Sequence, residues 1–140
     1  MHLYSFEKLD MWKDIRNFVN EIYEISDNFP YSEYKGLRDQ IRRASVSVSS
    51  NIAEGSGRLS FKEQARFIQI AYSSLLEVLS QLMVAYDRKY INESTYQKGR
   101  RLIENLSPRI SAYRKYLLQN VKKTTTSDSN LKNIHISTKN

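Results

Sequence analysis

The sequence predicts an all-α protein, an antiparallel up-and-down four-helix bundle, and two observations lead to this fold class. The first is that helix-breaking residues are few and gathered, which leaves long uninterrupted segments between them. They are Pro30, Gly36, Gly55, Gly57, Gly99 and Pro108. The second is that apolar residues in those segments recur three and four positions apart, as on one face of a helix. Four such segments with short connections bury their apolar faces by packing side by side.

We expect helices over residues 6–28, 33–54, 61–89 and 93–120, within one domain that covers residues 1–120. The apolar stripe of the first helix is Leu9, Trp12, Ile15, Val19, Ile22 and Ile25. That of the second is Leu37, Ile41, Ala44, Val48 and Ile52. The third stripe is Phe61, Ala65, Ile68, Tyr72, Leu75, Leu79, Leu82 and Tyr86. The fourth is Tyr96, Gly99, Ile103, Leu106, Ile110, Tyr113 and Leu117.

Three helix starts carry side chains that accept hydrogen bonds from free amides of a first turn. They are Ser5, Ser60 and Asn92, and Ser60 with Glu63 has the spacing of a full capping box. Pro108 lies inside the fourth stripe, where its ring is expected to kink the helix. The alternative is that Ser107 caps a fresh helix that begins at Pro108. Residues 121–140 are polar and basic, and we expect a disordered tail there.

The third helix carries a second apolar stripe beside its main one. Its members are Phe67, Ile70, Ala71, Ser74, Val78, Gln81 and Ala85. Because this arc is wider than a lone four-helix bundle normally buries, we expect a homo-oligomer interface at Phe67, Ile70, Ala71, Ser74 and Val78. The alternative is that the third helix is the central element of the bundle. In that case its neighbours within the chain cover both stripes.

Composition restricts the function. The chain has no cysteine, which removes disulfides, thiolate nucleophiles and the usual structural zinc sites. Its net charge of +7 favours polyanionic partners such as nucleic acid. No basic region followed by an apolar run begins the sequence, and no stretch reaches the roughly 18 apolar residues of a membrane span. We therefore expect a cytoplasmic protein without a membrane partner.

The sequence offers no enzyme active site, metal site or cofactor site. His2 and His135 lie in the termini, and no phosphate-binding loop or nucleophile with a positioned base is present. Asn51, Glu54 and Glu77 lie beside apolar positions, which predicts a structural polar network. The alternative for the two glutamates is an acid and base pair.

Basic residues gather on the second and fourth helices, whereas the first helix is acidic. The expected nucleic-acid-binding residues are Arg42, Arg43, Lys98, Arg100, Arg101 and Lys115. Arg42 is expected to project outward, and Lys122 and Lys123 of the tail to add a weaker contribution. Tyrosines close by in the sequence can stack on bases: Tyr90, Tyr96 and Tyr116. The alternative is a solvated basic face with incidental tyrosines.

The sequence resembles a known family at four segments. They are residues 6–12, the Phe29-Pro30 pair, residues 36–55 with the motif Asn-Ile-Ala-Glu-Gly, and residues 66–77. The chain is similar there to the bacterial four-helix-bundle proteins known as 23S rRNA intervening-sequence proteins. The resemblance implies an up-and-down bundle that assembles as a pentamer. The related accessory variability determinants of diversity-generating retroelements imply a reverse transcriptase and nucleic acid as partners.

Two function classes follow. The first is a non-catalytic, oligomeric protein that binds RNA or an RNA and DNA hybrid through backbone charge. The second is a protein-interaction scaffold, or an accessory subunit of a nucleic-acid enzyme such as a reverse transcriptase. Salt-sensitive binding of naked RNA by the purified protein separates them.

Overall fold

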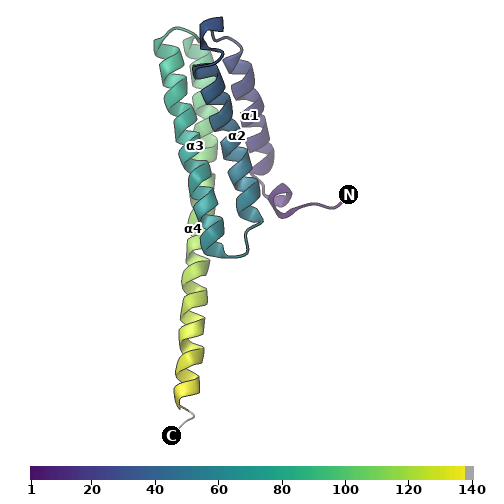
Figure 1. Cartoon of the computed structure of the whole chain (residues 1–140), viewed down its shortest axis with the longest axis vertical. Helices are drawn as coiled ribbons and strands as arrows, with labels where there is room; N and C mark the ends of the chain where they lie inside the picture. Colours follow the sequence, from purple (N-terminus) through teal and green to yellow (C-terminus); the bar gives the residue numbers. More distant parts are fainter. Residues whose placement is uncertain (138–140) are drawn as a thin grey trace.

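Four helices form the protein, and the prediction of an all-α four-helix bundle is confirmed (Figure 1). The computed structural model describes the backbone of residues 1–137 and the side chains of residues 1–123 and of Ser127. The helices are α1 (Trp12–Ser26), α2 (Leu37–Ser56), α3 (Phe61–Asp87) and α4 (Glu93–Ser137). Each packs against the next along the chain, and α4 also packs against α1, which closes the bundle.

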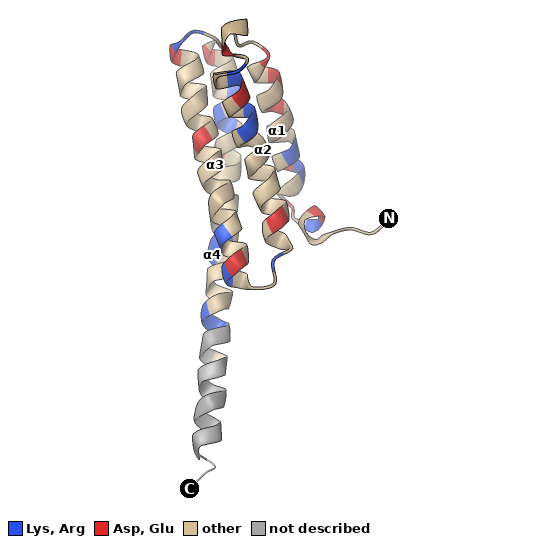
Figure 2. Ribbon diagram, viewed as in Figure 1, with Lys and Arg blue, Asp and Glu red and all other residues tan. Residues whose placement is uncertain are grey.

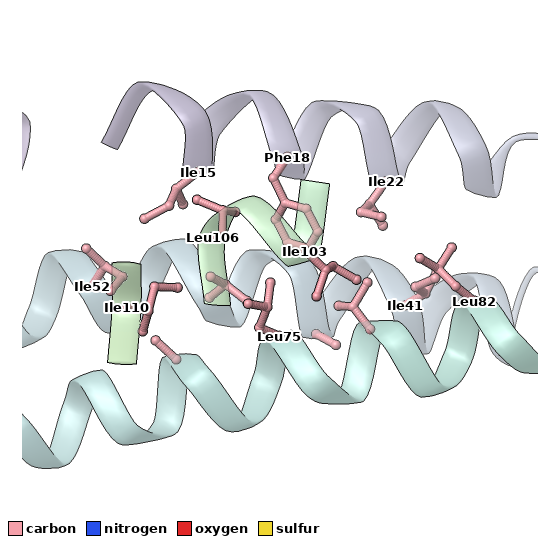
Figure 3. Close-up of a cluster of buried hydrophobic side chains, with 14 of the residues drawn as sticks. Ile15, Phe18, Ile22, Ile41, Ile52, Leu75, Leu82, Ile103, Leu106 and Ile110 are labelled. Atoms are coloured by element: carbon pink, nitrogen blue, oxygen red, sulfur yellow. The ribbon is translucent and has the colours of Figure 1, made fainter. Parts of the chain in front are cut away.

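The core lies on the bundle axis, where all four predicted stripes meet. Ile15 and Phe18 of α1 point toward Leu75 of α3 and Leu106 of α4, and none of these four side chains is more than 1% exposed (Figure 3). Complete burial of one such side chain contributes roughly 1.5–3 kcal/mol, so the shared core holds the helices together.

Close helix contacts depend on two glycines. A Cβ added at Gly99 would lie 2.8 Å from Cδ1 of Leu82, so α3 and α4 approach closely there. A Cβ added at Gly55 would lie 2.9 Å from Cβ of Phe67. Side chains larger than hydrogen at these two positions would push neighbouring helices apart.

The predicted first helix, residues 6–28, is wrong at its start. A 3-10 turn spans Ser5–Lys8, Leu9 is extended, and α1 begins only at Trp12. Ser5 does not cap a helix, because its Oγ atom donates to the Oγ atom of Ser56 over 3.1 Å. Since this contact ties the N-terminal segment to the end of α2, the chain must bend before α1 begins.

The predictions for the other helix starts fare better. The Oγ atom of Ser60 accepts a hydrogen bond from the Glu63 amide at 3.1 Å, and Oδ1 of Asn92 accepts one from the Thr95 amide at 2.8 Å. Both N-caps are therefore confirmed. The second helix begins at Leu37 and not at residue 33 as predicted, because a short 3-10 turn over Tyr31–Glu33 precedes it.

The fourth helix is longer than predicted. It passes through Pro108 as one helix, which excludes a fresh start at Ser107, and it continues to Ser137. A disordered tail from residue 121 was expected, but α4 projects past the end of the bundle (Figure 1). No glycine or proline follows Pro108, so nothing in the sequence breaks the backbone hydrogen-bond ladder. Residues 138–140 of the predicted tail lie outside the described residues.

The second stripe of α3 faces the inside of the bundle. Phe67, Ala71, Ser74 and Val78 are at most 8% exposed within the single chain, and only Ile70 of the predicted interface is open, at 38%. The physical reason is that α3 packs along both α2 and α4, so its neighbours in the chain cover a wide arc. This corrects the predicted oligomer interface and favours the alternative in which α3 is the central element.

Other apolar side chains of α3 remain open to solvent. They include Ile70, Leu76, Met83 and Val84, each between 38% and 45% exposed. Among the described helices, α3 alone is long and apolar enough to cross a membrane, a test that core helices of soluble proteins also pass. Its packing between α2 and α4 accounts for much of this apolar character.

Candidate nucleic-acid interface

Charge differs between the two ends of the bundle (Figure 2). At the basic end, which we define as residues 54–69 and 105–123, the acidic residues are Glu54 and Glu63. The cations of that end are Arg58, Lys62, Arg66, Arg109, Arg114, Lys115, Lys122 and Lys123. At the mixed end, residues 24–42 and 87–93, acidic and basic residues are close to equal in number. The basic end therefore carries the larger excess of positive charge.

Arg42 does not project outward as predicted. Its Nε atom donates to the Ser26 hydroxyl and its Nη2 atom to the Asp27 carboxylate, each over 2.7 Å. Its guanidinium also lies 4.6 Å from the centre of the Tyr23 ring. Arg42 points toward α1 because its position on α2 borders the interface with α1. The Ser26 hydroxyl and the Asp27 carboxylate lie at the end of α1 and accept its hydrogen bonds.

Two predicted cations on α4 are also engaged within the chain. Lys98 lies 2.8 Å from Oε2 of Glu21, and this hydrogen-bonded, charged neighbour raises the pKa of the Lys98 amine. Arg100 donates to the Tyr96 hydroxyl and to the Glu104 carboxylate, each over 2.9 Å. Those two partners raise the pKa of the Arg100 guanidinium, Tyr96 more than Glu104.

The remaining predicted cations are more available. Arg43 forms an exposed pair with Asp39 at 2.9 Å, and its side chain is 80% exposed. Arg101 and Lys115 are exposed and make no hydrogen bond or ion pair with another described side chain. They are 14 positions apart on α4, close to four helical turns, so they share one side of the helix about 21 Å apart.

The three candidate tyrosines also differ in how open they are to a ligand. Tyr90 is half-buried beside Phe29, with ring centres 5.9 Å apart. Tyr96 stacks on Tyr86 and its hydroxyl is taken by Arg100. Tyr116 is 56% exposed beside Lys115, so among the three it offers the most open face to a base.

Sequence reasoning missed part of the basic end. Lys62 and Arg66, in the first turns of α3, line a pocket with Arg114 of α4. The signal was present, because Lys62 and Arg66 are four residues apart and therefore share a helical face. Only the packing of α3 against α4 brings Arg114 to the same place.

The polar network is smaller than predicted and has other members. Asn51 Nδ2 donates to the Ser47 carbonyl over 2.8 Å and to the Ser47 hydroxyl over 3.1 Å. The Ser47 hydroxyl lies 2.8 Å from that of Ser74, which links α2 to α3. Glu54 is exposed and forms no side-chain hydrogen bond with a described residue, so within the single chain it takes no part in this network.

Glu77 also lies outside this network, because it is exposed and accepts a 3.3 Å hydrogen bond from Gln81. Because neither glutamate joins the network, we interpret the small residues of α2 as packing residues. Within the described residues, no cluster of three or more histidine or acidic side chains has the arrangement of a metal site. The chemistry that the described arrangement offers is the binding of anions by open cations.

The motif Asn-Ile-Ala-Glu-Gly acquires a physical meaning in this fold. Asn51 bonds back to Ser47, Ile52 is fully buried in the core, and Gly55 allows the close approach of Phe67. Its residues thus fix how α2 packs against α3.

Comparison with known proteins is consistent with these features. A search of curated proteins gave no match. Residues 7–112 match the family described as 23S rRNA-intervening sequence protein, a segment that takes in all of α1, α2 and α3 and the part of α4 inside the bundle. The chain therefore belongs to the 23S rRNA-intervening sequence protein family.

Proposed function

We propose that the protein is a non-catalytic, cytoplasmic, oligomeric nucleic-acid-binding protein that holds phosphate groups at its basic end and on the adjoining side of α4 that carries Arg101, with RNA as the favoured ligand. The observation that carries this proposal is the absence of any Asp or Glu between Glu104 and Asp128, a stretch that contains Arg114 and Lys115. Arg109 of that stretch pairs with Asp14 of α1 over 2.6 Å, whereas Arg114 and Lys115 have no carboxylate partner among the described residues. The family name, which refers to 23S rRNA, supports RNA over other polyanions.

Backbone charge explains how such a surface works. Each cation that neutralises a phosphate releases a condensed counterion, so affinity falls with salt by about 0.7 log units per contact and per log unit of salt for single strands. Arg101 and Lys115 mark one exposed side of α4. Tyr116, which is 56% exposed, can stack on a base next to them. Such binding reads little sequence, because phosphates are the same in every nucleotide.

Association of several copies would bring several basic surfaces together and strengthen their positive electrostatic potential. The open apolar side chains of α3, which include Leu76 and Met83, support association of several copies, and a pentamer is our favoured state. Light scattering after gel filtration tests this part of the proposal. A mass near that of the 16.5 kDa chain at micromolar concentration would contradict it.

RNA binding is tested by fluorescence anisotropy of a labelled single-stranded RNA over a range of salt concentrations. Reversing two open cations, Arg101→Glu with Lys115→Glu, should weaken binding about tenfold or more at low salt and flatten the salt dependence. Arg100→Gln is the matched control, because Arg100 already bonds Tyr96 and Glu104 and should contribute less. Helical content by circular dichroism checks that both variants fold.

A double reversal that binds RNA as tightly as the parent, with the same salt slope, would overturn the basic-surface proposal. The alternative function, a scaffold or accessory subunit for an enzyme such as a reverse transcriptase, would then gain. One observation favours that alternative, namely the exposed Leu76, Met83 and Val84 on α3, which a protein partner would cover as well as a second copy does.

A further inference from the structure

A pocket of about 460 Å³ lies where α4 leaves the bundle beside the first turns of α3. Its walls carry three cations, Lys62, Arg66 and Arg114, together with the carboxylate of Glu63 and the amide of Gln69. Ala65 and Leu118 give it an apolar floor. The pocket thus combines positive charge, a neutral hydrogen-bonding group and apolar surface in one small volume.

The charges around this pocket are poorly balanced within the chain. Arg66 has one acidic neighbour, Glu63, whose Oε1 atom lies 3.7 Å from the Arg66 Nε atom, beyond hydrogen-bond range. Lys62 and Arg114 form no ion pair with a described residue, and Arg114 is only half-exposed. One carboxylate against three cations leaves an excess of positive charge, and a half-buried guanidinium gains most from an anionic ligand.

Two other pockets lack such an excess of positive charge. The pocket between α1 and α4 is lined by Lys98 and Arg101 but also by Asp14, and Lys98 is already paired with Glu21. The pocket at the mixed end has Arg88 opposite Glu33. In both, the lining cations outnumber the lining carboxylates by at most one, whereas the pocket at Arg66 and Arg114 has three cations and one carboxylate, so its attraction for an added anion is stronger.

We infer that the pocket lined by Lys62, Arg66 and Arg114 binds one phosphate group of an RNA strand, with the adjoining nucleoside resting on Ala65 and Leu118. Guanidinium groups suit this ligand, because their planar donors match phosphate oxygens two at a time. The apolar floor adds contact for a base or ribose, which a free inorganic ion cannot use. This inference rests on the proposed function and assigns a specific site within the basic end.

The test compares full-length variants by anisotropy with a labelled oligouridine at several salt concentrations. Arg66→Gln with Arg114→Gln should weaken binding about tenfold or more and lower the salt slope by about 0.7, because one phosphate contact is lost. Glu63→Gln should act in the opposite direction and tighten binding, because it removes the competing carboxylate. Arg38→Gln with Arg88→Gln is the matched control, because it removes the same two charges at the mixed end, and it should change binding less.

The outcomes separate the pocket from the wider proposal. If the parent binds RNA but the double variant binds it equally well with an unchanged slope, the pocket assignment is wrong and the proposed function stands. If the parent binds no RNA, amide chemical shifts are followed while uridine monophosphate or inorganic phosphate is added. Shifts at residues 62–69 with the nucleotide alone would keep the pocket as a nucleotide site, whereas equal shifts with both, or none, would overturn the inference.

Discussion

The mixed end and the basic end both carry arginines, yet they hold them differently. At the mixed end Arg38 lies 3.8 Å from the centre of the Tyr34 ring, and both Arg38 and Arg42 reach Asp27. At the basic end Arg109 pairs with Asp14 over 2.6 Å, but Arg114 and Lys115 have no acidic partner among the described residues. The difference teaches that the number of cations in a segment does not measure its attraction for phosphate. What matters is whether the fold places a carboxylate beside each one.

The ends differ in backbone as well. The connection between α2 and α3 at the basic end begins at Gly57, which has a φ of −90°. At the mixed end, Lys89 follows α3 with a φ of 62°, the one positive φ among non-glycine residues that the structure describes. The helix end there is closed by a hydrogen bond from the Tyr90 amide to the Ala85 carbonyl at 2.9 Å. The mixed end therefore stores backbone strain that the basic end avoids.

The largest effect on stability is expected from Gly55→Ala at the basic end. The new Cβ atom would lie 2.9 Å from Cβ of Phe67, which is fixed close to the α3 backbone. Overpacking costs about 1–3 kcal/mol and better helix propensity returns about 1, so we expect a net loss of up to about 2 kcal/mol. Chemical denaturation measures it.

Gly57→Ala is the control for that measurement. A Cβ atom at Gly57 would meet only the Glu54 carbonyl oxygen, at an ordinary 3.5 Å. We expect no loss of stability, because the substitution restricts the unfolded chain and strains nothing. Equal losses for the two variants would show that close packing at Gly55 is not the cause.

The next effect is a gain at the mixed end from Lys89→Gly. Glycine adopts a positive φ without a steric penalty, so the free energy of unfolding should rise by about 0.5–1 kcal/mol. Arg88→Gly, one residue earlier with a φ of −78°, should lower it instead. A thermal melt of both variants gives the sign directly, and a lower melting temperature for Lys89→Gly would contradict the strain argument.

A smaller effect tests whether ion pairing with carboxylates keeps the arginines of the mixed end from binding RNA. Asp27→Asn removes the shared partner of Arg38 and Arg42, at a cost of about 0.5–1 kcal/mol in stability. If pairing is what keeps these arginines from RNA, affinity should rise about threefold and the salt slope should increase. Asp87→Asn changes the net charge equally at the same end without releasing an ion pair. Identical binding by the two variants would mean that the pairing has no role.

The smallest effect is expected from Glu54→Ala, which the sequence alone placed in a structural network. Glu54 is exposed, so the change in stability should stay within about 0.5 kcal/mol. Asn51→Ala, which removes the donor to Ser47, should cost about 0.5–1.5 kcal/mol in the same denaturation experiment. A larger loss for Glu54→Ala than for Asn51→Ala would restore the original interpretation.

Local rules were sufficient for most of the secondary structure. Apolar spacing placed the helices and the core residues Ile15, Ile41, Leu75 and Ile110, because burial of one helical face leaves a periodic record in the chain. The caps at Ser60 and Asn92 were readable because a cap acts on amides only two or three positions away. The start of the first helix was misplaced since it depends on Ser5 reaching Ser56, 51 positions along the chain.

The sequence by itself determined four amphipathic helices, a basic net charge and a motif specific to one family. Only the tertiary structure decided which cations are open, because Arg42 and Lys98 meet carboxylates of α1 that no local pattern pairs with them. It also decided that Phe67 and Ser74 lie inside the bundle, and that Arg114 joins Arg66 at one pocket. The physical reason is range: helix periodicity and capping act within a few residues, whereas burial and ion pairing depend on which helices become neighbours.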